Sequence, residues 1–411
     1  TGRRSTSDIF DFATNGDDVS QLISTFLFEF WWMFLLLFIL LFVLLKIFKN
    51  KISFENQGKP WFLRECIAFI FMMPILLVLV RGGMQMKPLD IIDATKYVRP
   101  KQTALVLNTS FTLMKTLDRE GLEEKTWFTD KEAEELFNPV RKAVPQNILP
   151  EKTNVVFIIL ESFGTERIAS VNPEMKTSYS PFLDSLAGEG LLFANGYANG
   201  KKSIEAVPAI VSSMPSLMND PYISSFYGEN EINSLPRILK KRGYSSAFFH
   251  GATNGSMQFD AFASLAGYDN YYGRKEYNNE DHSDHKWGIL DEYFNPWSAK
   301  QMAEMKAPFF TTLFTLSSHH PYFIPEHRKK DVINGPEPIC ASISYADLSL
   351  RLFFEEAKKH SWYENTLFVL LADHSPATRA PFYSTRMGLY KIPVLFYHPK
   401  GLLPKKKSKR I

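Results

Sequence analysis

The sequence predicts an α/β fold in which a mainly parallel central sheet is flanked by helices and preceded by a transmembrane helical anchor. Unbroken apolar runs recur in the second half of the chain, and such runs are typical of parallel strands covered on both faces. Helical patterns alternate with these runs, which indicates strand–helix–strand units. The apolar runs are 155–160, 309–316 and 366–372, and the helical patterns are 180–189, 231–242 and 341–360.

Composition excludes several classes of protein. The 411 residues include 47 Lys or Arg and 44 Asp or Glu, and the net charge of +3 is too small to favour nucleic acid as a partner. A charged fraction of 22% with 14% aromatic residues is the opposite of a disordered chain. Two cysteines, of which Cys66 lies in an apolar run, exclude a disulfide framework and a cysteine-rich zinc module.

Two apolar runs predict a transmembrane hairpin over residues 23–85. Residues 30–45 contain no polar side chain, and with 22–28 they are long enough to cross a bilayer. The second run, 66–80, is shorter and contains Pro74. A buried core helix is the alternative for this run, but its closeness to the first run favours two spans. A signal peptide is rejected because no basic segment and no small-residue cleavage site surround the first run.

The loop between the runs sets the predicted topology. This loop, at about 46–64, carries five lysines or arginines, whereas residues 1–22 are rich in aspartate. The positive-inside rule places the loop in the cytoplasm. Residues 1–22 and everything after the second run then lie outside. We therefore expect a multi-pass protein of the cell membrane with an extracytoplasmic catalytic domain.

Two further regions follow the hairpin. Residues 86–150 form a predicted helical linker, in which 104–117 suits a helix and 130–143 begins like a capped helix that Pro139 breaks. Residues 151–411 form the predicted catalytic domain. Because the chain begins with Thr1 and stops after a basic string at Ile411, we expect a fragment, with spans missing before it and a domain truncated at its C-terminus.

Carboxylates and imidazoles follow the three apolar runs and a fourth, short predicted strand at 247–249. In open α/β sheets the ligand site lies at the carboxyl ends of the strands. Glu161 could instead be an acid at a helix start, and Asp373–His374 could be an ordinary loop pair. All the residues that follow these strands, taken together, predict a shared metal site. The residues that follow the strands are Glu161, His250, His319, His320, Asp373 and His374.

The donor set and a nearby serine suggest metal-assisted chemistry. Oxygen ligands with one or two imidazoles suit manganese, zinc or magnesium. Ser203 follows the turn at 199–200 and begins a helical pattern, where amide donors and the helix dipole favour an anionic substrate. A plain N-cap serine with Glu205 in a loose capping pattern is the alternative. Lys201 and Lys202 beside it could hold phosphate, although exposed loop lysines often have no specific role.

Five pieces of sequence, in this order and spacing, resemble the lipoteichoic acid synthase-like (phosphoglycerol transferase) branch of the alkaline phosphatase/sulfatase superfamily. The resemblance covers residues 150–411 and, in outline, the anchor. It implies a sulfatase/alkaline phosphatase-like domain. The pieces are VVFIILES at 155–162, NGKKSIEAVPAI at 199–210, FFHG at 248–251, TLSSHHPY at 315–322 and LFVLLADHS at 367–375.

The resemblance also implies a site and a reaction. One divalent ion, with Mn²⁺ favoured over Mg²⁺ and Zn²⁺, would be held by Glu161, Ser203, Asp373 and His374. Ser203 would be the nucleophile, and His319 and His250 would contact the substrate. The family's reaction moves phosphoglycerol, or a related phospho-head group, from a phospholipid to an envelope polymer or glycan. It passes through a phosphorylated nucleophile, which divides one displacement into two.

Several positions depart from the family pattern. Lys202 stands where a threonine nucleophile is usual. The nucleophile is therefore assigned to Ser203, with a shift by one residue left open. Ser375 replaces a glycine, and 251–260 lacks the Trp and Arg of a glycerol-phosphate pocket. A sulfatase-like or phosphodiester hydrolase is therefore the alternative, although neither Ser203 nor Cys340 is followed by x-(Pro/Ala)-x-Arg.

Three other interpretations are weaker. A phosphoethanolamine transferase of lipid A would carry more cysteines, and an inactive anchored scaffold would have lost Glu161, Asp373 or His374. The Asp–His pairs at 281–285 resemble a second metal cluster but are better interpreted as a polar loop.

Overall fold

The computed structural model describes residues 31–51, 58–85, 87–117, 122, 125–138, 148–378 and 380–408. The expected segment 1–22, the start of the first span and the last three residues lie outside them. The chain divides into two compact units, 1–89 with 107–121 and 90–106 with 122–411. Each unit is described below by itself.

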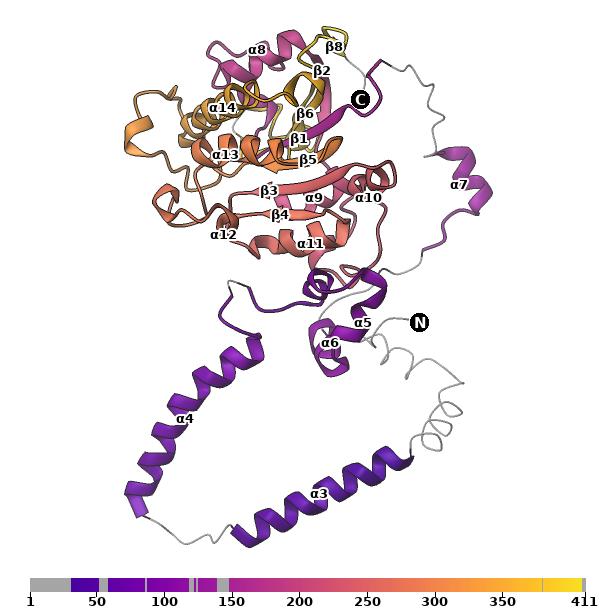
Figure 1. The fold of residues 1–411 in the computed structure, drawn as a ribbon, viewed down its shortest axis with the longest axis vertical. Helices are drawn as coiled ribbons and strands as arrows, with labels where there is room; N and C mark the ends of the chain where they lie inside the picture. The colour runs from indigo at the N-terminus through magenta and orange to yellow at the C-terminus, as the bar shows by residue number, and fades with distance from the viewer. Residues whose placement is uncertain are drawn as a thin grey trace. The chain divides into compact units, whose positions relative to one another are not determined.

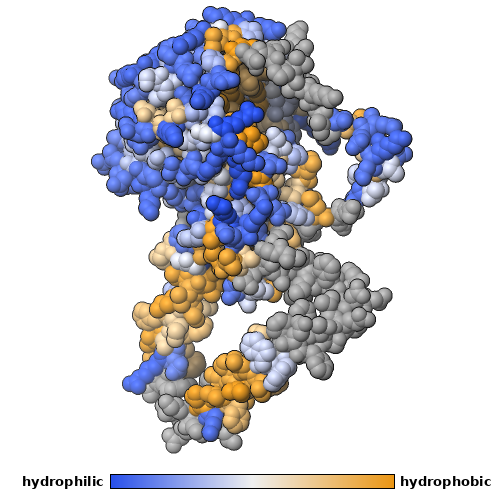
Figure 2. Space-filling view, turned by 45° about the vertical axis from the view of Figure 1, so that its right-hand side comes forward, coloured by the Kyte–Doolittle hydropathy of each residue, from blue (hydrophilic) through white to orange (hydrophobic). Residues whose placement is uncertain are grey.

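The first unit consists of apolar helices. Helices α3 (Trp31–Lys51) and α4 (Gly58–Arg81) expose leucine, phenylalanine and isoleucine over residues 31–47 and 62–80, as Figure 2 shows in orange. Among the described residues, one helical segment, Phe62–Arg81, is long and apolar enough to cross a membrane, and none of it is buried. Within the described residues this run is therefore not a buried core helix. The apolar part of α3, Trp31–Ile47, is shorter, and the two-span hairpin stays a prediction.

The predicted linker divides at Asn108. The expected helix over 104–117 is two helices, α5 (Thr103–Val106) and α6 (Thr109–Thr116). The Asn108 side chain accepts hydrogen bonds from the backbone N–H groups of Ser110 and Phe111 and so caps α6. Helix α7 (Asp130–Leu136) begins with the expected cap, because Thr129 and Glu132 form a capping box. The 3₁₀ helices η1 (Ile91–Lys96) and η2 (Pro100–Gln102) lie in the second unit.

The second unit contains a mixed, mostly parallel sheet (Figure 1). Its order is β4-β3-β5-β1-β6-β7-β2-β8. The pairs from β4 to β6 are parallel, whereas β7 is antiparallel to both β6 and β2. The strands are β1 Asn154–Leu160, β2 Leu191–Tyr197, β3 Ser245–His250, β4 Asn270–Tyr272, β5 Phe309–Phe314, β6 Thr366–Ala372, β7 Lys391–Tyr397 and β8 Lys406–Ser408.

Alternate residues of β1 enter two hydrophobic clusters, so helices cover both faces of the sheet. Val156 and Ile158 pack with α8, α13 and α14, whereas Ile159 packs with α9 and α11. Burial on both faces explains why the strand sequence is apolar without alternation. The helices are α8 Pro181–Glu189, α9 Ser203–Ser212, α10 Leu235–Lys240, α11 Phe259–Ala266, α12 Arg274–Tyr277, α13 Asp291–Ala303 and α14 Pro338–Ala357.

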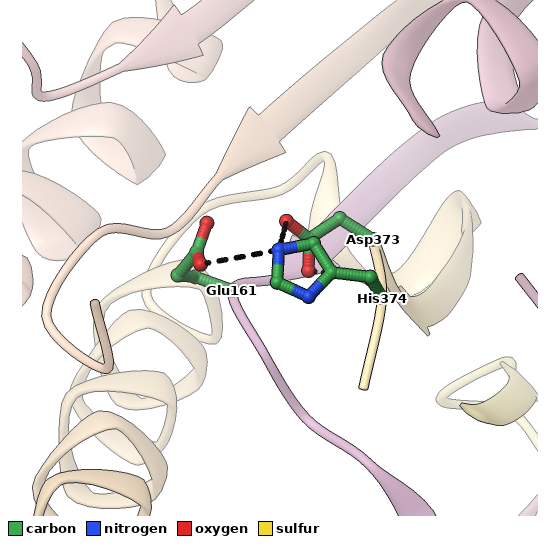
Figure 3. A group of neighbouring side chains, drawn as sticks. All are labelled: Glu161, Asp373 and His374. Atoms are coloured by element: carbon green, nitrogen blue, oxygen red, sulfur yellow. Dashed lines mark hydrogen bonds and ion pairs between the residues drawn. The ribbon is translucent and has the colours of Figure 1, made fainter. Parts of the chain in front are cut away.

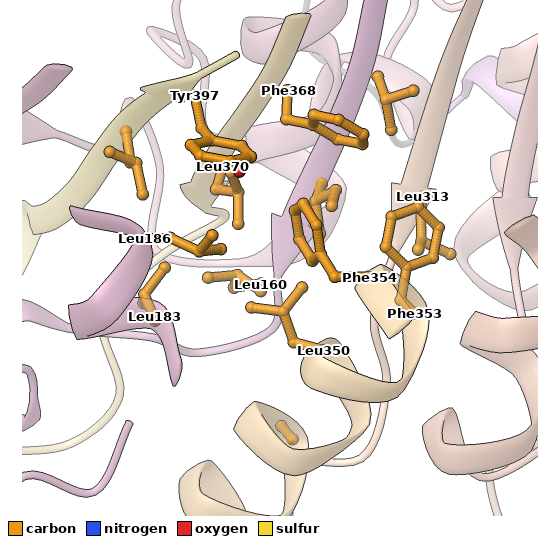
Figure 4. Packing of buried hydrophobic residues seen from close by; sticks show 14 of the residues in the cluster. Leu160, Leu183, Leu186, Leu313, Leu350, Phe353, Phe354, Phe368, Leu370 and Tyr397 are labelled. Atoms are coloured by element: carbon orange, nitrogen blue, oxygen red, sulfur yellow. The ribbon is translucent and has the colours of Figure 1, made fainter. Parts of the chain in front are cut away.

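Helix α14 forms the centre of the first cluster (Figure 4). Leu350, Phe353 and Phe354 project from one side of the helix and are fully buried. The Phe354 ring lies 4.9 Å from that of Phe368 on β6 and 6.0 Å from that of Tyr397 on β7. This packing holds β6, the strand that precedes Asp373, against β1.

The topology brings the loops of several strands to one edge of the sheet. The parallel strands β1, β3, β5 and β6 all end at this edge, and β7 begins there because it runs antiparallel to β6. The end of β2 is paired with the start of β7, since Tyr197 lies opposite Lys391. We call this the carboxyl edge. The α/β fold is confirmed, and residues distant in the chain meet here.

Candidate metal centre and active site

Glu161 lies directly after β1, and its backbone is held on both sides by the loop after β5. Its N–H donates to the Thr315 hydroxyl at 3.0 Å, and its carbonyl oxygen accepts from the Ser318 hydroxyl. The carboxylate is 3% exposed, and Oε1 accepts a hydrogen bond from Ser162 Oγ at 2.7 Å. Burial raises the pKa of Glu161 well above its usual range, and repulsion from the Asp373 carboxylate is the second cause.

Asp373 and His374 follow β6 and face Glu161 (Figure 3). Asp373 Oδ1 accepts from the backbone N–H groups of Ser162 and His374, both at 2.8 Å. Its other oxygen, Oδ2, is buried and receives no hydrogen bond. His374 Nε2 lies 3.3 Å from that oxygen and 3.7 Å from Glu161 Oε1. An imidazole nitrogen and two carboxylates thus converge on one point.

These residues fit a divalent cation. One donor atom from each of Glu161, Asp373 and His374 lies within 4.8 Å of the others. His374 Nδ1 lies 3.1 Å from the Ser375 carbonyl oxygen, a contact that places the proton on Nδ1 and leaves the Nε2 lone pair facing the carboxylates. Two buried carboxylates without a cation are costly. A metal ion would satisfy Asp373 Oδ2 and the Nε2 lone pair together.

Ser203 contacts this group from α9, a helix that covers one face of the sheet. It is the first residue of α9, it is 4% exposed, and its hydroxyl donates to Glu161 Oε2 at 3.2 Å. Lys202 is the N-cap residue and makes no side-chain cap. The hydroxyl therefore lies at the positive end of the α9 dipole, beside N–H groups of the first turn that have no partner within the helix.

The substrate-binding candidates occupy the same edge, but no hydrogen bond or ion pair joins these described residues to Glu161, Asp373 and His374, which we call the metal group. His250 ends β3, is 4% exposed and stacks on Phe314 at 4.7 Å. Burial lowers the pKa of His250 to about 4. His319 is partly exposed in the loop after β5, and its ring lies 4.3 Å from that of Trp287. The Lys202 side chain is exposed to solvent.

Residues missed by the sequence analysis hold the ligands in place. Ser162 donates through its backbone to Asp373 and through its hydroxyl to Glu161, and Thr315 and Ser318 fix the Glu161 backbone. The signal was their position, because Ser162 and Ser318 follow predicted strands and Thr315 lies near the end of one. Serine and threonine are too common in loops for this position alone to identify them.

Trp287 and Asp291 support the loop that carries His319. Trp287 Nε1 donates to the His320 carbonyl oxygen at 2.9 Å, and His319 Nδ1 lies 2.8 Å from the same oxygen. Asp291 is 1% exposed and accepts from the backbone N–H groups of Leu316 and Ser317. Residues 287–292 therefore stabilise the loop that carries His319.

The Asp–His pairs at 281–285 form no metal group among the described residues. Asp284 accepts from the backbone N–H groups of residues 286–288, and the His282 ring stacks on Tyr293 at 3.8 Å. These contacts agree with the interpretation as a polar loop.

Comparisons with known proteins agree with this geometry. The Sulfatase family model matches residues 153–411. Lipoteichoic acid synthase 1 of Bacillus subtilis is 30% identical over 54% of this chain and 36% of its own length. Lipoteichoic acid synthase of Staphylococcus saprophyticus is also 30% identical, over 54% of this chain and 36% of its own length. The chain thus covers about a third of the length of these relatives.

Solved structures match over the catalytic unit. A protein of the alkaline phosphatase superfamily from Vibrio parahaemolyticus is 25% identical with a TM-score of 0.56, and the match covers 64% of each chain. The lipoteichoic acid synthase LtaP from Listeria monocytogenes has a TM-score of 0.55 at 23% identity, over 66% of this chain and 72% of that one, and supports the fold. The family model covers more than half of the chain. The chain therefore belongs to the sulfatase family of the alkaline phosphatase superfamily and is an enzyme related to the lipoteichoic acid synthases.

Proposed function

We propose that this enzyme transfers phosphoglycerol, or a related phospho-head group, from a phospholipid to an envelope polymer or glycan through a phosphoserine at Ser203. The observation that carries the proposal is the position of Ser203 Oγ, 3.2 Å from Glu161 Oε2 and at the start of α9. The similarity to lipoteichoic acid synthases supports a phospholipid donor and a polymer acceptor.

Glu161, Asp373, His374 and Ser203 would hold one divalent ion, with Mn²⁺ favoured over Mg²⁺ and Zn²⁺. Such an ion lowers the pKa of a hydroxyl and neutralises charge on phosphoryl oxygens. Ser203 Oγ attacks phosphorus, the bond from phosphorus to the diacylglycerol oxygen breaks, and that oxygen takes up a proton. The N–H groups at the start of α9 stabilise the phosphoryl charge during attack.

In the second step, an acceptor hydroxyl attacks the phosphoserine and Ser203 leaves. His319 and His250 contact the head group, and Lys202 attracts its phosphate. With a pKa of about 4, His250 is neutral near pH 7 and offers a hydrogen bond without charge. The enzyme is anchored by a two-span hairpin, with its catalytic domain outside the cell membrane.

The test uses the full chain with Mn²⁺ and fluorescent phosphatidylglycerol. Diacylglycerol is followed by chromatography and the phosphoglycerol adduct by intact mass. We expect both products in the wild type and in Lys202→Ala, and neither in Ser203→Ala. Ser212→Ala, at the other end of the same helix, is the matched control and should behave as the wild type.

Each other outcome changes the proposal in a defined way. An adduct that survives in Ser203→Ala would overturn the choice of nucleophile. Diacylglycerol accompanied by free glycerol phosphate, even when a glycan acceptor is present, would show a phosphodiester hydrolase. Absence of bound metal in the wild type would overturn the site.

A further inference from the structure

Exposed apolar side chains gather on the loops of the carboxyl edge. Among described residues 148–378 and 380–408, six large hydrophobic side chains are exposed. Ile148 and Ile238 are two of them, and the other four lie on carboxyl-edge loops. The four are Leu217 (81% exposed), Met387 (61%), Phe382 (49%) and Phe323 (44%). Exposed apolar residues are ordinary when scattered, but these four lie on loops of the edge that carries Glu161, Asp373 and His374.

Hydrogen bonds and one lysine–aromatic contact connect the residues on the Ser203 side of this edge. Ser216, next to Leu217, donates through its N–H to Asn199 Oδ1 at 3.1 Å, close in the chain to Ser203. The Tyr390 carbonyl oxygen accepts from the N–H of Ala198 at 2.7 Å. Lys201 Nζ lies 5.3 Å from the Tyr390 ring centroid. Segments 213–218 and 380–390 therefore both contact the turn at 198–201, which precedes Ser203 in the chain.

The second of these segments joins the remaining apolar groups. The Tyr390 N–H donates to the Met387 carbonyl oxygen, and Lys391 Nζ lies 5.2 Å from the Phe382 ring centroid. Phe323 approaches from another loop, because it follows the turn in which Tyr322 N–H donates to the His319 carbonyl oxygen. We call residues 198–203, 213–218, 315–325 and 380–391 the rim.

The charge of the rim differs from that of the opposite edge. The rim contains no aspartate or glutamate, and it carries Lys201, Lys202, Arg386 and Lys391. The segments that enter β1, β5 and β6 at the amino edge, 151–153, 304–308 and 358–365, carry charges of both signs. Glu205, which accepts a hydrogen bond from the Lys201 N–H, lies beside these segments, so cations are in excess rather than alone. Exposed apolar groups with an excess of cations match the interface of an anionic bilayer, where apolar side chains enter and cations meet head groups.

We propose that the rim docks onto an anionic phospholipid surface and presents the Ser203 site directly to lipid head groups. The inference rests on the proposed phospholipid donor. A head group lies at the bilayer surface, so a site surrounded by residues that enter this surface reaches the phosphate without extraction of the acyl chains.

The first experiment measures insertion and needs no turnover. The full chain with Cys66→Ala and Met387→Cys is labelled with a polarity-sensitive fluorophore, since Cys340 is buried. The protein is reconstituted in vesicles of phosphatidylcholine with or without phosphatidylglycerol, and brominated lipids serve as quenchers. Lys359→Cys, at the opposite edge of the domain, is the matched control.

We expect blue-shifted emission and quenching at position 387 in vesicles that contain phosphatidylglycerol, a weaker effect in phosphatidylcholine alone, and neither at position 359. Equal behaviour at the two positions would overturn the proposal. A shielded label at 387 that responds to neither quencher nor lipid composition would also overturn it, because a protein partner would then cover the rim.

The second experiment separates docking from chemistry. The variant Leu217→Ser, Phe382→Ser, Met387→Ser should lose at least ten-fold in turnover of long-chain phosphatidylglycerol in vesicles. It should stay within two-fold of wild type with a monomeric short-chain analogue. Equal losses on both substrates, or no loss on either, would overturn docking. A wild type that is inactive on both while the label inserts would instead refute the phospholipid donor.

Discussion

Two pairs of buried carboxylates lie near the carboxyl edge, and their surroundings differ. Asp291 and Glu292 at the start of α13 are satisfied by this chain: Asp291 by backbone N–H groups after β5, and Glu292 by Arg328, His327 and Tyr345. Glu161 and Asp373 are equally buried, yet Asp373 Oδ2 has no hydrogen bond and the nitrogen beside it is His374 Nε2, 3.3 Å away.

The difference shows how to separate structural from functional acids. A buried carboxylate whose oxygens are all occupied by donors of the chain stabilises the fold. A buried pair of carboxylates in which one oxygen accepts no hydrogen bond and an imidazole lone pair lies nearby lowers the stability of the fold. A bound cation would offset this cost. The predictions below test whether the two pairs respond in opposite ways.

The largest expected effect is that of Asp373→Asn. This change should weaken Mn²⁺ binding by more than about 100-fold, because loss of an outer partner of a ligand alone costs up to that amount. Activity should fall with it. Without metal, the variant should unfold at a higher temperature than wild type, because a like-charge contact is removed. Titration calorimetry and thermal unfolding in chelator measure the two effects. A metal-free variant that is less stable than wild type would contradict the comparison.

Glu292→Gln should have the opposite signature. The change removes the buried one of the two carboxylates that pair with Arg328 and leaves only the exposed Asp331. It should cost about 3 kcal/mol, the low end for a buried ion pair because Arg328 is 28% exposed. Denaturant unfolding measures the loss, and Mn²⁺ affinity of the folded protein should not change. Glu326→Gln, which removes an exposed pair with Lys329, is the control and should cost less than about 1 kcal/mol.

Asp291 should make stability depend on pH. Burial raises its pKa to about 6, so the folded state keeps a proton that the unfolded state loses near pH 4. Stability from this group is therefore complete below about pH 4, falls as pH rises to about 6 and is level above, a change on the order of 2–3 kcal/mol. The wild type and Asp291→Asn are compared by denaturant unfolding between about pH 4 and 7. A difference that does not vary with pH would show that this carboxyl group is already ionised throughout.

The smallest expected effect is that of Trp287→Phe. It removes one of two donors to the His320 carbonyl oxygen but keeps an aromatic ring beside His319. One neutral hydrogen bond is worth about 1 kcal/mol, so kcat should fall roughly five-fold with little change in KM or stability. Trp287→Ala should lose more. If both variants keep full activity, the orientation of His319 does not depend on Trp287.

Local sequence patterns predicted the elements that are continuous and apolar. Strands β1 and β6 were recognised within one residue, and β5 ends two residues before the expected end, where the Thr315 hydroxyl accepts from the Glu161 N–H. Helix α10 is shorter than expected because Ser234 caps it and Pro236 lies in its first turn. Strand β7 was missed, because Pro393 interrupts its apolar run and its antiparallel pairing depends on residues far away.

The metal group could be predicted because parallel strands deliver their following residues to one edge. Its supporting contacts could not, because they depend on register. Ser162 meets Asp373 only because Leu160 is aligned with Ala372. The burial of His250 against Phe314 likewise follows from the pairing of β3 with β5. Neither register is visible in a local pattern.

The place of β1 in the sheet also constrains how the chain folds. β1 is the first strand of the sheet, yet Val155 is paired with Phe310 on one side and Leu367 on the other. Such non-local pairing slows folding, and an apolar strand without neighbours is prone to aggregate. During synthesis β1 therefore stays unpaired until almost the entire domain has been made. A chain cut before residue 372 should therefore yield insoluble protein rather than a smaller folded unit.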